Sequence, residues 1–225
     1  MSDFNKTLYK ANQGEYVEKK SRFLCDLFYV ESEAEVQDAL ALTKKKYYDA
    51  RHHCSAMILK PDANPPMLRS SDDGEPQGTA GRPILDVLTG FGAYNILAVV
   101  TRYFGGTLLG TGGLIRSYTK AAQDALSKSE FLTRMYGYPL SFGVSYTLSG
   151  KLDYVISSNN IPMIDKSYAE DVNYEIILPE GQTDRILKLL SEETSGNIAF
   201  EPGPLTEFAQ EDGIILTGSA LLPPK

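Results

Sequence analysis

The chain of 225 residues contains no tryptophan, two cysteines and two histidines. Two cysteines are too few to cross-link a disulfide-rich fold, and in a reducing compartment we expect Cys25 and Cys54 to be unbridged, buried apolar residues. His52 and His53 are adjacent, so on a strand they would point to opposite faces and could not readily bind one metal ion. A structural zinc site needs four ligands at suitable spacing. We therefore expect neither a metal site nor a resident cofactor.

The sequence also lacks an apolar run long enough to span a bilayer, and residues 1–16 lack the apolar segment of a signal peptide. These absences favour a cytoplasmic location with no membrane partner. Residues 1–136 contain 17 Lys and Arg against 16 Asp and Glu, a net charge of +1, whereas residues 137–225 contain 5 against 13, a net charge of −8. Affinity for nucleic-acid backbones depends on clustered Lys and Arg. Any nucleic-acid contact is therefore expected in the first part of the chain.

Glycine, in contrast, is concentrated in residues 101–119, which read TRYFGGTLLGTGGLIRSYT. An apolar run at 96–100 precedes this stretch, and apolar residues at helical spacing follow a helix start near Gly113, so we predict a strand, a glycine loop and a helix. Backbone N–H groups at a helix N-terminus attract anions. The candidate anion site consists of Arg102, Gly105, Gly106, Gly110, Gly112, Gly113 and Arg116.

On this hypothesis, replacing Arg102 with alanine weakens ligand binding and leaves the fold intact. The alternative is a tight turn in which the glycines relieve crowding and the arginines are solvated. The spacing matches neither the phosphate-binding loop of nucleotide triphosphatases, since Thr111 stands where a lysine is needed, nor the dinucleotide fingerprint. The glycine pattern alone leaves both interpretations open.

A second stretch, residues 70–81, contains the acids Asp72, Asp73 and Glu75. A carboxylate cluster can bind a divalent cation, but Asp-Asp-Gly is typical of a turn, and we favour the turn. Thr79 is expected to cap a helix over residues 80–89. The candidates for a cleft beside the glycine loop are Asp73, Glu75, Thr79 and His53. The acids would pair with the arginines or orient a bound group; no residue is assigned a catalytic role.

The remaining patterns indicate two domains. Residues 15–30 contain a half-buried strand, residue 32 begins a helix, and residues 49–59 form another strand. After a boundary near residues 136–139, strands are predicted at 140–148, 161–169, 172–178 and 197–201, with helices at 150–159 and 182–193. This βαββαβ order is the ferredoxin-like plan. The expected domains are residues 1–136 and 137–205, followed by a tail, 206–225, that straps back over a domain or stays mobile.

The segments DGEPQGTAGRPIL and VVTRYFGGTLLGTGGLIRSYTKA closely resemble the signature segments of the Impact/YigZ family, whose bacterial members are also called YvyE. The resemblance covers most of residues 1–135, and the remainder is similar to the small second domain of the bacterial members. It implies an α+β fold of two two-layer α/β-sandwich domains. The first would share its fold with the second domain of a small-subunit ribosomal protein and with domain four of elongation factor G. The second would be ferredoxin-like, similar to domain five of that factor.

The resemblance also implies a role in translation, since eukaryotic relatives regulate translation through the amino-acid-starvation kinase pathway. We therefore expect a cytosolic, translation-associated regulatory or binding protein with an anion site for RNA or a phosphorylated small molecule. Its partners would be RNA, the ribosome or a translation factor. One alternative is an enzyme acting on a small anionic substrate, with Asp73 and Glu75 as acid and base and the arginines as clamps. Another is a protein-interaction module without an active site.

Overall fold

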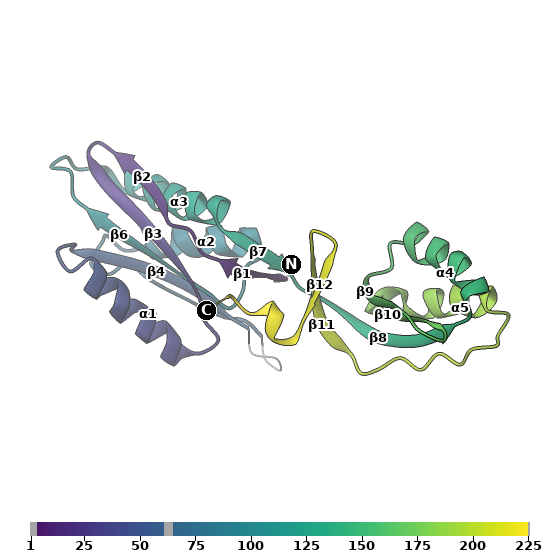
Figure 1. Ribbon diagram of the computed structural model, residues 1–225. Coiled ribbons are helices and arrows are strands. Elements are labelled where there is room, and N and C mark those ends of the chain that lie inside the picture. Colours follow the sequence, from purple (N-terminus) through teal and green to yellow (C-terminus); the bar gives the residue numbers. More distant parts are fainter. Residues whose placement is uncertain (1–3, 61–64, 225) are drawn as a thin grey trace. The chain divides into compact units, whose positions relative to one another are not determined.

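The computed structural model describes residues 4–60 and 65–224, in two compact units that divide after Leu132 (Figure 1). The sequence placed this boundary near residues 136–139. The difference arises because the strand that opens the second unit begins at Met135, before the alternating pattern becomes clear at residue 140.

The first unit is built on a five-stranded sheet in which every neighbouring pair is antiparallel. Its strands, in spatial order, are β2 (Gly14–Glu18), β3 (Ser21–Tyr29), β6 (Ile96–Tyr103), β4 (His52–Leu59) and β5 (Met67–Ser71). A separate two-stranded sheet pairs β1 (Lys6–Lys10) with β7 (Glu130–Thr133). The central strands β6 and β4 are almost entirely buried, as expected for strands covered on both faces.

Three helices cover this sheet. On one face, α2 (Gly81–Phe91) and α3 (Gly110–Lys128) pack on side chains such as Phe23, Cys54 and Val100. On the other face, α1 (Glu33–Lys46) packs on side chains such as Met57 and Val99. The expected α+β class is confirmed. Helix α1 adds a partial third layer that the two-layer expectation lacked.

The second unit has the ferredoxin-like strand order. Its elements are β8 (Met135–Val144), α4 (Tyr146–Ser158), β9 (Met163–Tyr168), β10 (Val172–Pro179), a 3₁₀ turn (Glu180–Gln182), α5 (Thr183–Glu193), β11 (Thr206–Glu211), β12 (Ile214–Thr217) and a second 3₁₀ turn (Gly218–Leu221). The spatial order is β12-β11-β8-β10-β9, so the first strand, β8, lies between the third, β10, and the fourth, β11. Strand β12 is an additional edge.

The fourth strand lies later in the chain than the sequence indicated. Ile198 and Phe200 pack against the core of the second unit without strand pairing, so their apolar alternation predicted a strand at 197–201 wrongly. The strand begins at Thr206, after Pro204, because proline lacks the N–H that a ladder requires. Residues 206–217, predicted as part of a tail over 206–225, instead form two strands of the second sheet, β11 and β12.

Candidate functional site

A buried ion pair lies at the end of β6, on the face that α2 and α3 cover. Arg102 Nη1 donates to Glu75 Oε1 at 2.6 Å, and the two side chains are only 8% and 4% exposed. Tyr118, on α3, donates its hydroxyl to the same Glu75 oxygen at 2.8 Å. The Arg102 guanidinium also lies 5.5 Å from the centroid of the Phe23 ring. The structure thus brings two candidate residues together, but it buries Arg102 where the anion hypothesis required an arginine open to ligand.

A thiol extends this cluster. Cys54 Sγ lies 3.3 Å from the Tyr118 hydroxyl and 3.0 Å from the Asp72 carbonyl oxygen, and it can donate to either. Burial raises the pKa of Cys54 to about 12, and burial also raises the pKa of Tyr118. Since a thiolate is the reactive form of cysteine, Cys54 is not an activated nucleophile at neutral pH. Cys25 is buried and unbridged as well, as expected.

The carboxylate of Asp72 caps α2, a role that the sequence analysis assigned to Thr79. Asp72 Oδ1 accepts from the N–H groups of Ala80 and Gly81 at 3.0 and 2.8 Å, and its Oδ2 accepts from that of Gly78 at 2.8 Å. Burial alone would raise the pKa of Asp72, but these three backbone donors outweigh it and lower the pKa. The cap is therefore a charged group that lies eight positions before Ala80 and nine before Gly81 in the sequence.

The other cleft candidates have structural partners. Thr79 donates its hydroxyl to the Pro76 carbonyl at 2.6 Å and makes no cap. Asp73 accepts from the His53 N–H at 2.7 Å, and His53 Nδ1 lies 3.1 Å from Thr101 Oγ1. Burial lowers the pKa of His53, so its ring is neutral at neutral pH. Because His53 is opposite Thr101 in the ladder, it lies on the sheet face away from the ion pair.

Backbone geometry accounts for three glycines between the end of β6 and the first residue of α3. A Cβ on Gly105 would overlap the backbone of Lys20 and Ser21, so only glycine fits there. Gly106 and Gly110 have φ of +83° and +68°, a region that favours glycine, and nothing lies within 4 Å of the Cβ that either would carry. The alternative of a turn that relieves crowding therefore describes Gly105. The other two line an open surface.

Helix α3 begins at Gly110, three residues before the predicted start near Gly113. Its first turn contains no acidic residue, and no side chain in the described part of the chain caps it. A Cβ on Gly113 would meet Leu109 Cβ at 3.0 Å, whereas a Cβ on Gly112 would meet only Arg116 Nη1, at 3.6 Å. The exposed Arg116 side chain, which has no hydrogen bond or ion pair with any described residue, therefore lies over the uncapped turn.

A cavity of about 540 Å³ opens at the ends of β4 and β6. Its lining residues are Asp49, Ala50, Arg51, His52, Arg102, Tyr103, Phe104 and Leu108. Tyr103 donates its hydroxyl to Asp49 at 2.8 Å, and burial together with this bond raises the pKa of Tyr103 to about 12. Arg51, His52, Phe104 and Leu108 were not among the site residues predicted from the sequence. The register of β4 against β6 is the signal that would have identified His52, because His52 is opposite Arg102 and lies on the same face of the sheet.

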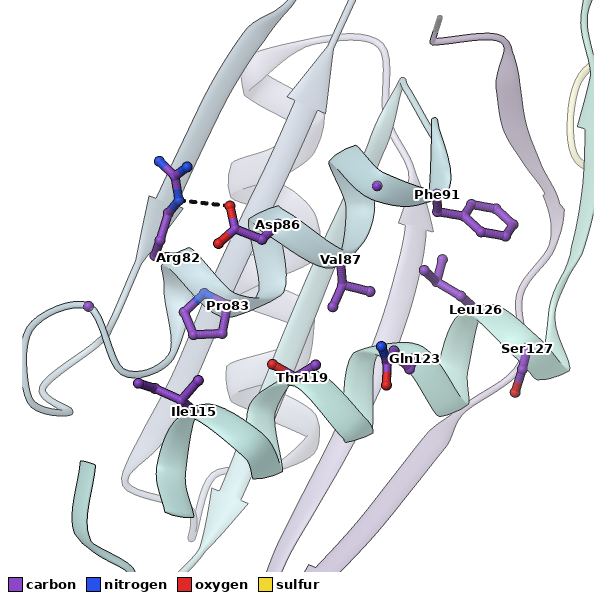
Figure 2. A pocket seen from close by; sticks show the side chains of 12 residues that line it. Arg82, Pro83, Asp86, Val87, Phe91, Ile115, Thr119, Gln123, Leu126 and Ser127 are labelled. Atoms are coloured by element: carbon purple, nitrogen blue, oxygen red, sulfur yellow. Dashed lines mark hydrogen bonds and ion pairs between the residues drawn. The ribbon is translucent and has the colours of Figure 1, made fainter. Parts of the chain in front are cut away.

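A second hollow, of about 710 Å³, runs between α2 and α3 and is distinct from this cluster (Figure 2). Val87, Ile115 and Leu126 are among its apolar walls, and the Arg82–Asp86 ion pair lies on its rim.

Over the described ranges, no group of three His, Cys, Asp or Glu side chains is arranged to hold a metal ion. No helix in the described part of the chain is both long enough and apolar enough to cross a bilayer.

The chain matches known proteins over both units. Residues 19–126 match the model of the Impact N-terminal domain, and residues 142–197 match that of a domain of unknown function, DUF1949. The chain is similar to the IMPACT family member YvyE of Bacillus subtilis, with 36% identity over 89% of this chain and 91% of that protein. It is also similar to the IMPACT family member YigZ of Escherichia coli, with 33% identity over 80% of this chain and 88% of that protein.

Among solved structures, a protein titled "Crystal structure of an hypothetical protein" aligns with a TM-score of 0.51 and 32% identity, covering 87% of this chain and 96% of that one. The alignment therefore extends over nearly the whole length of that chain. These similarities confirm the resemblance carried by the two signature segments, and the chain belongs to the IMPACT family.

Proposed function

We propose that this chain is a cytoplasmic, translation-associated regulatory or binding protein whose first domain holds an anionic ligand at the N-terminal turn of α3. Its partner would be RNA, the ribosome or a translation factor, or else a phosphorylated small molecule. Membership of the IMPACT family supports the translation-related part, because the family resemblance implies regulation of translation by eukaryotic relatives. The local chemistry of the α3 turn supports the anion site.

One observation carries the anion site: no crowding among the described residues requires glycine at position 112. It lies in a helix, where glycine costs about 0.5–1 kcal/mol relative to alanine. Its added Cβ would have an ordinary van der Waals contact at 3.6 Å and no clash. Glycine at a helical position lowers stability, and here packing does not require it. Close approach of a ligand to the backbone would explain why glycine is present. Uncapped N–H groups and the helix dipole favour a negatively charged ligand.

Arg116 supplies the charge for this turn. Its guanidinium lies beside Gly112, and no described carboxylate pairs with it. Lys20, whose backbone packs against Gly105, presents a further exposed cation at the β2–β3 turn. Charge-assisted hydrogen bonds from such groups to phosphate are about twice as strong as neutral ones.

The acid–base residues of the enzyme alternative are already engaged. Glu75 accepts from Arg102 and Tyr118, and Asp73 accepts from the His53 N–H. The geometry therefore favours binding over general acid–base chemistry at these residues.

The test is fluorescence anisotropy of a labelled RNA oligomer at two salt concentrations, with inorganic phosphate as competitor. Arg116→Glu should weaken RNA binding at least about tenfold and reduce the salt dependence, because a phosphate contact is replaced by repulsion. Lys151→Glu makes the same charge change on the exposed face of α4 and serves as the matched control. If Arg116→Glu binds RNA and phosphate as the wild type does, the anion site is wrong.

A further inference from the structure

The cavity at the ends of β4 and β6 is bounded by a flat aromatic ring that the fold leaves open. Phe104 is 58% exposed and Leu108 is 82% exposed, although both are large apolar side chains. The guanidinium carbon of Arg102 lies 5.6 Å from the Phe104 ring centroid, so a cation supports the ring on one side. Adjacent apolar side chains at the rim of a cavity are typical of a binding surface rather than of a packed core.

Polar groups surround the same cavity. Arg51 is exposed and makes no hydrogen bond or ion pair with any described residue. His52 Nδ1 lies 2.9 Å from the Asp73 carbonyl oxygen, and since a carbonyl can only accept, this nitrogen carries the proton. The second ring nitrogen of His52 is then an acceptor that is available to a donor on a ligand.

The inner wall holds an unsatisfied donor. Arg102 is 7% exposed and lines the cavity, and its Nε has no hydrogen-bond partner among the described residues. That nitrogen is buried, so Arg102 contributes to the cavity by supporting the Phe104 ring and not by offering a donor to a ligand. The cavity thus combines a flat apolar surface with the free cationic side chain of Arg51 and the acceptor nitrogen of His52.

We propose that this cavity takes one unpaired nucleotide, with its base stacked on Phe104 beside Leu108 and its phosphate held by Arg51. Aromatic side chains stack on bases of any sequence, and basic side chains beside them hold the backbone. Duplex RNA cannot use the ring, because its bases are already stacked and paired. A volume of about 540 Å³ lies within the range of small-molecule sites.

This inference rests on the proposed function, because it names the ligand class of the same end of the first domain. A nucleotide within single-stranded RNA and a free nucleoside monophosphate present the same chemistry to the cavity. An acidic peptide with an aromatic side chain is the competing occupant.

The experiment measures binding of the full chain to a labelled ten-nucleotide oligoadenylate and to an RNA duplex of the same length. Adenosine monophosphate and polyglutamate serve as competitors. Phe104→Ala should weaken binding of the oligomer about tenfold and leave binding of the duplex unchanged. Phe104→Tyr, which keeps a ring, should retain the affinity. Tyr154→Ala removes an aromatic side chain that is 73% exposed on α4 and is the matched control.

Preferential binding of the oligomer that Phe104→Ala abolishes supports the inference, and competition by adenosine monophosphate then separates free nucleotide from RNA as the ligand. If Phe104→Ala is silent while Arg116→Glu weakens binding of both RNAs, the stacking site is overturned and the proposed anion site stands. Displacement of the oligomer by polyglutamate but not by adenosine monophosphate also overturns it, in favour of an acidic protein. Failure of every RNA to bind overturns the RNA form of the proposed function together with this inference.

Discussion

Replacing Arg102 with alanine should destabilise the first domain strongly. The variant leaves the Glu75 carboxylate, whose side chain is 4% exposed, with Tyr118 as its hydrogen-bond donor among the residues that the structure describes. Removing one partner of a buried ion pair costs about 3–5 kcal/mol, because the remaining charge stays buried without compensation. Loss of the guanidinium contacts with Phe23 and Phe104 adds to this cost. The expectation drawn from the sequence, an intact fold in Arg102→Ala, is therefore replaced by its opposite.

Urea unfolding followed by far-ultraviolet circular dichroism measures the effect, since the chain has no tryptophan to report by fluorescence. A loss of 3–5 kcal/mol should lower the thermal midpoint of the domain by about 10–20 °C. Glu75→Gln, measured singly and combined with Arg102→Ala, completes a double-mutant cycle that isolates the coupling between the two side chains. Arg116→Ala, on the exposed face of α3, is the control and should be nearly neutral. An Arg102→Ala variant within about 0.5 kcal/mol of the wild type would show that the pair does not hold the site together.

Three further predictions concern residues around this cluster. Gly105→Ala should lower the free energy of unfolding in urea by about 1–3 kcal/mol, because its Cβ overlaps the β2–β3 turn. Gly112→Ala, at an open helical position, should raise it by about 0.5–1 kcal/mol. Equal effects of the two substitutions would contradict the reasons given for the two glycines. Asp72→Ala should cost about 1–2 kcal/mol at pH 7 as a lost helix cap. Because folding lowers the pKa of Asp72 below its ordinary value of 3.8, the stabilisation is present above that pH, and the gap from the wild type should close as pH falls below it in acid titrations of unfolding. Cys54, whose pKa is raised to about 12, should react with a thiol reagent at pH 8 far more slowly in the native chain than in urea, and equal rates would refute its burial.

Local periodicity predicted most elements of the fold. The apolar run at 96–100 became β6, and the helical spacing from Leu114 to Leu126 became α3, because long periodic segments bury one continuous face. Ser32 caps α1 through a bond from the Glu35 N–H at 3.3 Å, as its spacing indicated. These features depend on neighbours within one turn or one strand, which a sequence displays directly.

Features that depend on distant partners could not be predicted in this way. Asp72 caps a helix that begins nine residues later, and Glu75 meets Arg102 across 27 positions. The register between β4 and β6 decides which of the two adjacent histidines lies on the same sheet face as Arg102. Because the sequence does not display this register, His53 was predicted as the cleft residue, whereas the structure places His52 on that face. The glycines of this stretch occur for two different reasons: Gly105 avoids a clash with neighbouring backbone, whereas Gly112 lies at an open position. The spacing of glycines in the sequence could not separate these reasons.

The order of strands in the first sheet has a consequence for synthesis of the chain. Strand β6 lies at the centre of the sheet, between β3 and β4, yet it follows both in the sequence. Two strand pairs of this sheet, β2 with β3 and β4 with β5, are local in sequence and can form as soon as their residues leave the ribosome. These two pairs become joined only when β6, residues 96–103, has been synthesised and can lie between β3 and β4. Contacts between residues so far apart in sequence make folding slow, because a long loop must close before they form. A nascent chain that ends before Ile96 therefore exposes two hydrophobic half-sheets, and it depends on chaperones or on rapid elongation until the central strand joins them.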